Sequence, residues 1–381
     1  MMKVARVIIA TLLILVLSGL VLSQKPRKLK DSRVRYRGPQ DRSTRTVRVD
    51  DLKRLAKYIA QAQGDYISSE ACGVCHTGIY DWWFASGHAH KLRSAEEARG
   101  AGIPHPESVT WNDIKWVIGG FGWKARFIGK DGYIITQGGK NQFNLETRAW
   151  TDYHANEQKP YSCGACHTTG YDPTGNQEYL PGVVGTWVYP AIQCERCHGP
   201  GKNHVLSGGD ETKITVDRTS AMCGECHYRT DPNIIPAKGG FIRHHEQYNE
   251  FLKSGHSQTM ECVSCHDPHK PAGSSIKLTC ADCHADVAAV YQTSEMGEAG
   301  VSCEDCHMPY MSKSAVSLRK WVGDVKTHLF LFNLDANAQP FTADGSEANG
   351  YITSEYGCLV CHYDRDKAWA ATFIGTVHTI Q

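Results

Sequence analysis

No cysteine of this 381-residue chain lies outside one repeated pentapeptide, Cys-x-x-Cys-His. All 16 cysteines belong to its eight copies, which are Cys72/Cys75/His76, Cys163/Cys166/His167, Cys194/Cys197/His198, Cys223/Cys226/His227, Cys262/Cys265/His266, Cys280/Cys283/His284, Cys303/Cys306/His307 and Cys358/Cys361/His362. The lack of a spare cysteine argues against a disulfide framework, which would show neither the fixed spacing nor the histidine. Zinc ribbons need two Cys-x-x-Cys pairs per metal ion and no histidine after each pair. A thioredoxin-like site would need one motif beside a βαβ pattern, so eight copies argue against it as well.

Cys-x-x-Cys-His is the attachment signature of c-type haem. Its two thiols, one helical turn apart, reach the two vinyl groups of a porphyrin, and the adjacent imidazole binds the iron axially. The sequence therefore predicts eight covalently bound haems c, each with one iron, whose proximal ligands are His76, His167, His198, His227, His266, His284, His307 and His362.

The chain also has little net charge, +1, and an ordinary hydrophobic fraction of 41%. Eight haems amount to one for roughly every 45 residues, so haems rather than long side chains must supply much of the core. The 36 glycines suit a backbone that turns tightly beside flat macrocycles. We expect a mainly α, haem-packed multihaem cytochrome with little regular secondary structure.

One stretch has a β pattern instead, and it predicts a small β-hairpin insertion near residues 116–136. Ala125 and Phe127 alternate with charged residues, residues 129–132 (GKDG) are typical of a turn, and residues 133–136 are rich in β-formers. Ahead of the first motif, Leu52, Leu55, Ala56 and Ile59 form one apolar stripe, which predicts a helix that begins at Asp50 or Asp51.

Only one long apolar run is present, from Val7 to Leu22, after Lys3 and Arg6. It predicts a signal peptide over residues 1–23, cleaved after Ser23. An uncleaved membrane anchor is the alternative, because the run is near the short limit for spanning a bilayer. No cysteine lies there, which excludes a lipoprotein. We expect an exported protein, periplasmic or at the cell surface, and N-terminally anchored if the run is retained.

Residues 25–48 hold ten Lys or Arg and two Asp, so residues 24–49 form a basic arm ahead of a mildly acidic body. Such an arm is most often a solvated segment, and docking to an acidic partner or to membrane headgroups is the second interpretation. A nucleic-acid partner does not fit an exported haem protein. The motif spacing then divides the chain into a one-haem region with the β insertion (50–162), a six-haem core (163–307) and a C-terminal one-haem region (308–381).

Eleven of the 19 histidines lie outside the motifs, which exceeds the eight needed to give every iron a second axial ligand. Position relative to the motifs and to haem-poor stretches selects His88, His154, His204, His244, His245, His256, His269, His328 and His378 as distal candidates. His244 and His245 are adjacent and point apart, so one of the two is expected to bind iron. His90 and His105 are left over.

The strings CHTTGY, CERCHGPGKNH, HHEQYNEFLKSGH, CHDPH and CEDCHMP resemble those of multihaem c-type cytochromes from about Ile67 to His378. That group includes the tetrahaem electron acceptor of hydroxylamine oxidoreductase, pentahaem nitrite reductases and octahaem oxidoreductases. The resemblance implies that the histidines in SGH, GPGxxH and CHDPH strings are distal ligands, namely His88, His204, His256 and His269.

The chain has enough histidines to give every iron two axial ligands, which favours an electron carrier. Its partners would be redox protein donors and acceptors, possible examples being a membrane-associated quinol oxidase or a terminal reductase. The alternatives are an oxidoreductase acting on a small nitrogen or sulfur compound at one open haem, and a subunit of an extracellular cytochrome filament or other homo-oligomer. All eight motifs end in histidine, whereas pentahaem nitrite reductases carry a lysine there, and no catalytic residue is assigned.

Overall fold

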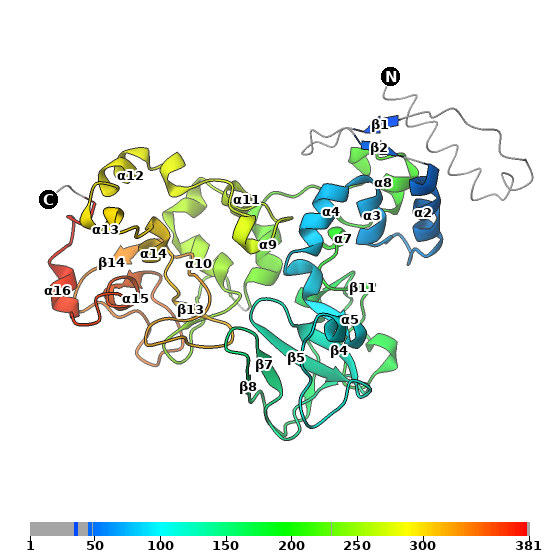
Figure 1. Cartoon of the computed structure of the whole chain (residues 1–381), viewed down its shortest axis with the longest axis horizontal. Helices are drawn as coiled ribbons and strands as arrows, with labels where there is room; N and C mark the ends of the chain where they lie inside the picture. The colour runs from blue at the N-terminus through cyan, green and yellow to red at the C-terminus, as the bar shows by residue number, and fades with distance from the viewer. Residues whose placement is uncertain (1–33, 37–44, 48, 230, 379–381) are drawn as a thin grey trace, which may run out of the picture. The chain divides into compact units, whose positions relative to one another are not determined.

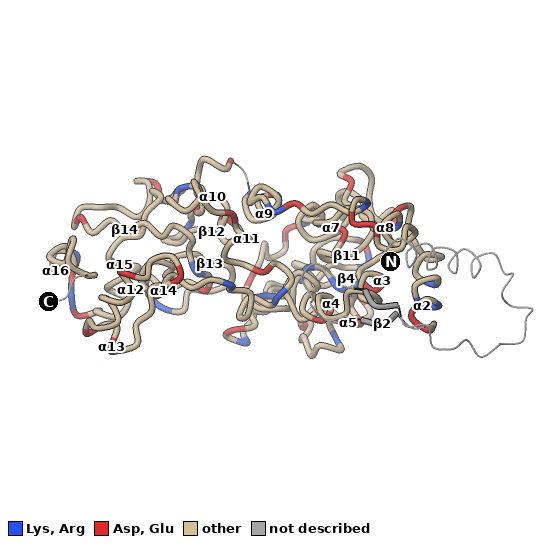
Figure 2. The backbone as a smooth tube through the Cα atoms, turned by 90° about the horizontal axis from the view of Figure 1, so that it is seen from above, with Lys and Arg blue, Asp and Glu red and all other residues tan. Residues whose placement is uncertain are grey.

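The computed structural model describes residues 34–36, 45–47, 49–229 and 231–378. The expected signal peptide (1–23) and most of the basic arm (24–49) lie outside this part and remain predictions. Among the described residues, no helix combines the length and the apolar character needed to cross a membrane. Acidic and basic residues are interspersed along the chain (Figure 2).

The chain divides into two compact units. Unit 1 comprises residues 1–143, 149–217 and 269–274, and unit 2 comprises residues 144–148, 218–268 and 275–381. The first three motifs belong to unit 1 and the last five to unit 2. The division predicted from motif spacing, at residues 162 and 307, is based on haem density rather than on contacts and stays a prediction.

Unit 1 begins with three helices (Figure 1), which are α2 (Val49–Ala60), α3 (Ser69–Cys75) and α4 (Thr77–Phe84). The expected apolar stripe of α2 buries Leu55, which packs with Ile67, Ala71 and Val74 in a small core. Because Ala71 and Val74 alternate with the cysteines on α3, this core fixes the orientation of the first motif.

A seven-stranded sheet follows, in which β3, β4, β5, β6 and β9 lie side by side, while β7 pairs with β5 and with β8. The strands are β3 (Leu92–Ser94), β4 (Ile114–Gly119), β5 (Lys124–Gly129), β6 (Tyr133–Ile134), β7 (Gln142–Asn144), β8 (Ala149–Thr151) and β9 (Lys159–Pro160). Gly132, at φ +86°, allows the tight turn between β5 and β6. The β region is therefore larger than a small insertion at 116–136, because short strands from distant segments complete it.

The sheet encloses its own apolar core, in which Trp116 and Trp187 meet edge to face. The remaining elements of unit 1 are α5 (Ala95–Gly100), α6 (Gly164–His167), β10 (Thr168–Thr169), β11 (Tyr189–Pro190), α7 (Cys194–His198) and α8 (Lys202–Leu206). A separate two-stranded pair joins β1 (Val34–Tyr36) to β2 (Arg45–Val47).

Unit 2 has short helices and only two-residue strands. Its helices are α9 (Ser220–His227), α10 (Gln247–Lys253), α11 (Cys262–Cys265), α12 (Ala285–Tyr291), α13 (Glu295–Glu298), α14 (Cys303–His307), α15 (Ser354–Gly357) and α16 (Lys367–Ala371). Its parallel strand pairs are β12 (Ile242–Arg243) with β13 (Ser312–Lys313), and β14 (Phe332–Asn333) with β15 (Ile352–Thr353). These pairs run through an apolar core that contains Ile242, Met311 and Ile352. Little regular structure is present, as expected where haems rather than side chains fill the space between short segments.

Candidate haem sites

Each Cys-x-x-Cys-His motif lies on, or directly beside, one helical turn. Backbone N–H groups of His76, His266 and His284 donate to the carbonyl oxygens of the first cysteine of their motifs at 2.8–2.9 Å. This i to i+4 bond places the two thiols one turn apart and the imidazole at the end of the turn. All 16 cysteines lie in the described residues and none forms a disulfide, so their thiols are available for thioether bonds.

Three motifs differ in how far their second cysteine is exposed. These cysteines are Cys166 on α6, Cys197 on α7 and Cys226 on α9. Cys197 is exposed to solvent, whereas Cys166 and Cys226 are half-buried. Across the described residues, no cluster of three or more His, Cys, Asp or Glu side chains is arranged to hold a metal ion directly. Haem attachment at Cys166, Cys197 and Cys226, as at the other motif cysteines, therefore remains a prediction from the motif.

Two pairs of motifs are held together by the same reciprocal hydrogen bonds. The Ser69 hydroxyl accepts the Cys194 N–H at 2.9 Å, and the Ser69 N–H donates to the side chain of the preceding Gln193. In unit 2 the Ser220 hydroxyl accepts the Cys262 N–H at 2.9 Å, and the Ser220 N–H donates to Glu261. The first and third motifs, and likewise the fourth and fifth, are therefore fixed against each other.

Buried Glu195, inside the third motif, strengthens the first of these junctions. Its carboxylate accepts backbone N–H groups of Ile67 and Gly201 at 2.9 and 2.7 Å and of Ser68 at 3.0 Å. Burial raises the pKa of Glu195, while the three N–H donors oppose that rise. Sequence analysis did not select Glu195, because the variable positions of a Cys-x-x-Cys-His motif carry no signal of burial.

Six motif histidines face a histidine from elsewhere in the chain. The pairs and their ring-centre distances are His76 with His204 (6.4 Å), His198 with His269 (6.1 Å), His227 with His245 (6.3 Å), His284 with His256 (6.1 Å), His266 with His328 (6.1 Å) and His307 with His378 (5.7 Å). Two imidazoles on opposite sides of one metal ion, with metal–nitrogen bonds of about 2.0 Å and ring centres roughly 1 Å farther, lie about 6 Å apart. These residues therefore fit an iron between them.

The second ring nitrogen of several of these histidines is already oriented. Nδ1 of His198 and of His307 lies 2.7 Å from a backbone carbonyl, Thr215 O and Phe330 O respectively. Nδ1 of the distal candidate His204 lies 2.9 Å from another carbonyl oxygen. An acceptor at Nδ1 fixes the tautomer and leaves Nε2 to bind a metal.

Burial favours the neutral form of some of the paired imidazoles. Burial lowers the pKa of His76 to about 4, with a further contribution from His204, and burial lowers the pKa of His328 to about 3. A neutral imidazole is the form that binds iron. The fully buried Glu250 holds His328, because it accepts the His328 N–H and the Thr327 hydroxyl. Burial raises the pKa of this carboxyl to about 7.

Six of the nine distal candidates lie opposite a motif histidine in these pairs. The ring of His244 is tilted against that of His245, and its Nε2 accepts a hydrogen bond from Arg229 at 3.0 Å, whereas His245 faces the motif histidine His227. His154 contacts Glu157 through Nδ1 at 2.6 Å. His88 begins the short 3-10 turn that follows α4. Iron binding by all nine distal candidates remains a prediction.

The two motif histidines outside the six pairs each have an aromatic neighbour. The ring of Tyr161, fully buried, lies 6.5 Å from that of His167. His362 contacts Trp369 at 4.8 Å. Sequence analysis missed both aromatic residues, since aromatic side chains near a motif are common in ordinary cores.

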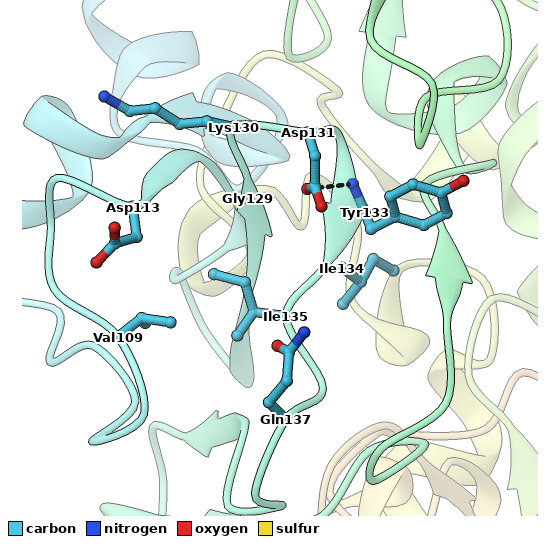
Figure 3. Close-up of a pocket in the computed structure, with 9 residues that line it drawn as sticks. All are labelled: Val109, Asp113, Gly129, Lys130, Asp131, Tyr133, Ile134, Ile135 and Gln137. Atoms are coloured by element: carbon cyan, nitrogen blue, oxygen red, sulfur yellow. Dashed lines mark hydrogen bonds between the residues drawn. The ribbon is translucent and has the colours of Figure 1, made fainter.

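A cleft of about 290 Å³ lies in the β region of unit 1, and none of the motif or distal-candidate residues lines it. Figure 3 shows residues that line it, among them Asp113, Lys130, Ile134 and Ile135, with the Asp131 carboxylate bonded to the Tyr133 N–H. Neither cysteine nor histidine lines it, so it is not a haem site.

Comparison with known proteins agrees with this site chemistry. The family model described as cytochrome c554 and c-prime matches residues 136–199, which contain the second and third motifs. The chain is 21% identical over 370 residues to dissimilatory sulfite reductase MccA of Wolinella succinogenes, with 66% of this chain and 51% of that protein covered. It is 23% identical over 176 residues to multiheme cytochrome MtrA of Shewanella baltica, with 42% and 48% covered. The chain spans about half the length of these relatives.

Two solved structures share the fold. The octaheme sulfite reductase MccA of Wolinella succinogenes, form II, superposes with a TM-score of 0.60 at 18% identity, over 77% of this chain and 65% of that chain. The outer cell wall cytochrome OcwA superposes with a TM-score of 0.54 at 18% identity, over 82% and 86%. The chain is a multihaem c-type cytochrome.

Proposed function

We propose that this protein relays electrons through eight covalently bound haems c, most of them held between two histidines. The observation that carries the proposal is the set of six histidine pairs whose ring centres lie 5.7–6.4 Å apart. When bound, haem c supplies one-electron exchange between ferrous and ferric iron. Two imidazole ligands suit both oxidation states, so little rearrangement accompanies each transfer.

The chain's own residues support this role in two ways. Backbone carbonyls at Nδ1 of His198 and His307 hold the imidazoles in one orientation. Reciprocal bonds through Ser69 and Ser220 keep motifs from sequence-distant segments close together, which favours short paths between their haems. Burial and hydrogen bonding at the ligands then tune the potentials.

A pyridine haemochrome assay of the purified holoprotein tests the haem number, and we expect eight haems per chain. A stepwise redox titration should show reversible one-electron waves that account for all of them. A count well below eight, or haems that do not exchange electrons with one another on a rapid-mixing timescale, contradicts the relay.

A second candidate is an oxidoreductase acting on a small nitrogen or sulfur compound. Two observations favour it: one relative is named a dissimilatory sulfite reductase, and one motif histidine, His362, has an indole rather than an imidazole against its ring. Turnover of sulfite, nitrite or hydroxylamine with a reduced viologen dye or a ferric acceptor distinguishes the two functions, since a pure relay gives no substrate-dependent rate.

We also propose export to the periplasm or cell surface, with redox proteins as donors and acceptors. A quinol oxidase or terminal reductase in the membrane and a filament of identical subunits remain the specific alternatives. The likeness of the fold to an outer cell wall cytochrome supports a location outside the cytoplasm. Cell fractionation with haem staining tests the location, and electron microscopy of the purified protein tests the filament.

A further inference from the structure

The C-terminal motif differs from six of the other seven in the partner of its histidine. All 19 histidines of the chain lie in the described residues, and His362 makes ring contact with none of them. Its ring neighbour is Trp369, with ring centres 4.8 Å apart and planes inclined by 48°. That spacing is shorter than the 5.7–6.4 Å of the six histidine pairs, so no metal ion fits between the two rings.

The position of Trp369 follows from the local fold. The chain turns directly after the motif, where the Arg365 N–H donates to His362 O at 3.1 Å. The Asp366 side chain then caps α16 by accepting the Trp369 N–H at 2.8 Å. Phe373 and the Arg365 guanidinium also contact the indole, at 5.0 and 5.8 Å from its ring centre. Trp369 is therefore held against the imidazole itself, as a positioning residue for His362.

Trp369 does not serve as a second ligand, because the indole N–H is a donor only. Histidines outside the six pairs have other contacts in the described structure. The Nε2 of His244 is bonded to Arg229, His154 contacts Glu157, and His90 lies beside Phe121 at 4.8 Å. Both Cys361 and His362 are exposed to solvent.

We propose that His362 is the only protein ligand to the iron of the C-terminal haem, and that the sixth position takes a small external ligand, either a diatomic molecule or a compact anion. The inference rests on the proposed function only in requiring a haem at the eighth motif. An iron with one imidazole is high-spin when ferric and binds cyanide, and its ferrous form binds carbon monoxide, whereas the six bis-histidine sites are low-spin and closed.

The first test uses the wild-type holoprotein, purified with a haemochrome count of eight. Electron paramagnetic resonance of the ferric form should show a high-spin signal of at least one haem per chain, and cyanide should convert it to low-spin. The absence of a high-spin signal overturns the inference. A high-spin signal that appears only on dilution also overturns the inference. In that case a second copy of the chain supplies the sixth ligand at high protein concentration and dissociates on dilution.

The second test assigns the signal to the eighth motif. The double variant Cys358→Ala with Cys361→Ala should carry seven haems, and both its high-spin signal and its cyanide binding should fall by one haem per chain. The matched control, Cys280→Ala with Cys283→Ala, removes a haem from a bis-histidine site (His284 with His256) and should also carry seven haems but keep both properties. Retention of the full wild-type signal in the first variant overturns the assignment.

A milder variant covers the case in which a haem-deletion variant fails to accumulate. Trp369→Ala removes the packing against His362 and should change the line shape of the high-spin signal and the cyanide dissociation rate several-fold, with the low-spin signals unchanged. Trp369→Phe, which keeps an aromatic ring there, should restore values close to wild type. Unchanged cyanide kinetics in Trp369→Ala would contradict the role of Trp369. A haem count below eight in the wild type would instead contradict the proposed function.

Discussion

The imidazole rings of His198 and His269 lie parallel, with planes inclined by 1° and ring centres 6.1 Å apart. In unit 2, the rings of His284 and His256 are close to perpendicular, at 73°. Both arrangements suit two axial ligands, but they differ in how they split the iron d orbitals. Parallel imidazole planes separate the two π-type orbitals, and perpendicular planes leave them nearly equal in energy.

This difference predicts two kinds of low-spin ferric signal. The pairs inclined by 1°, 20° and 21° should give rhombic spectra, and those inclined by 68° and 73° should give strongly anisotropic spectra with a large maximum g value. Electron paramagnetic resonance of the oxidised holoprotein measures both. A spectrum with only one of the two kinds would contradict the ring orientations.

The adjacent histidines 244 and 245 offer a matched pair of variants. His245→Ala should convert the haem of His227 to one protein ligand and add one high-spin haem per chain, because the rings of His227 and His245 face each other at 6.3 Å. His244→Ala should leave the spin states unchanged, because His244 bonds to Arg229 instead. The reverse result would show that the wrong member of the pair has been chosen.

Glu195 should stabilise unit 1 by joining two motifs. Glu195→Ala leaves the N–H groups of Ile67, Ser68 and Gly201 without their acceptor, and each buried unpaired donor costs about 1–3 kcal/mol. We expect a loss of roughly 3 kcal/mol or more in unfolding free energy, seen as a lower melting temperature of the holoprotein. A change of less than about 0.5 kcal/mol, the range of ordinary surface substitutions, would contradict the role.

The same carboxyl has a defined pH dependence. Burial raises its pKa in the folded state, so the stabilising contribution linked to this shift is fully present below the ordinary carboxyl pKa and is lost as the pH rises through the raised value. The melting temperature of the wild type should therefore fall relative to that of Glu195→Gln, which cannot ionise, as the pH rises through this range. An identical pH profile in the two proteins would rule out titration of Glu195.

Gly224 allows the fourth motif to pack tightly. A Cβ atom there would lie 2.8 Å from the Tyr248 ring, closer than real contacts allow. Gly224→Ala should therefore destabilise the protein by about 1–3 kcal/mol and reduce haem incorporation at this motif. Gly273→Ala is the control, because nothing lies within 4 Å of the added atom. Equal haem content and melting temperature in both variants would contradict the packing.

The sequence contains the full chemistry of attachment, because thiol spacing and the adjacent histidine are local properties of one helical turn. Its pattern also indicates the six distal candidates that lie opposite a motif histidine in the structure. His204, His256 and His269 were selected from short strings near motifs, and the structure places each opposite a motif histidine, though not always that of the nearest motif. His269 follows the fifth motif in the chain but faces His198 of the third.

The chain by itself determined the class of protein, the number of attachment motifs and the proximal ligands. Only the tertiary structure decided which distal histidine faces which motif, that His245 rather than His244 faces His227, and that His362 packs against Trp369. The physical reason is the range of the interactions. A Cys-x-x-Cys-His turn closes within five residues, whereas a distal ligand is positioned by contacts such as those of Glu250 with residues almost 80 positions away, and local sequence carries no record of them.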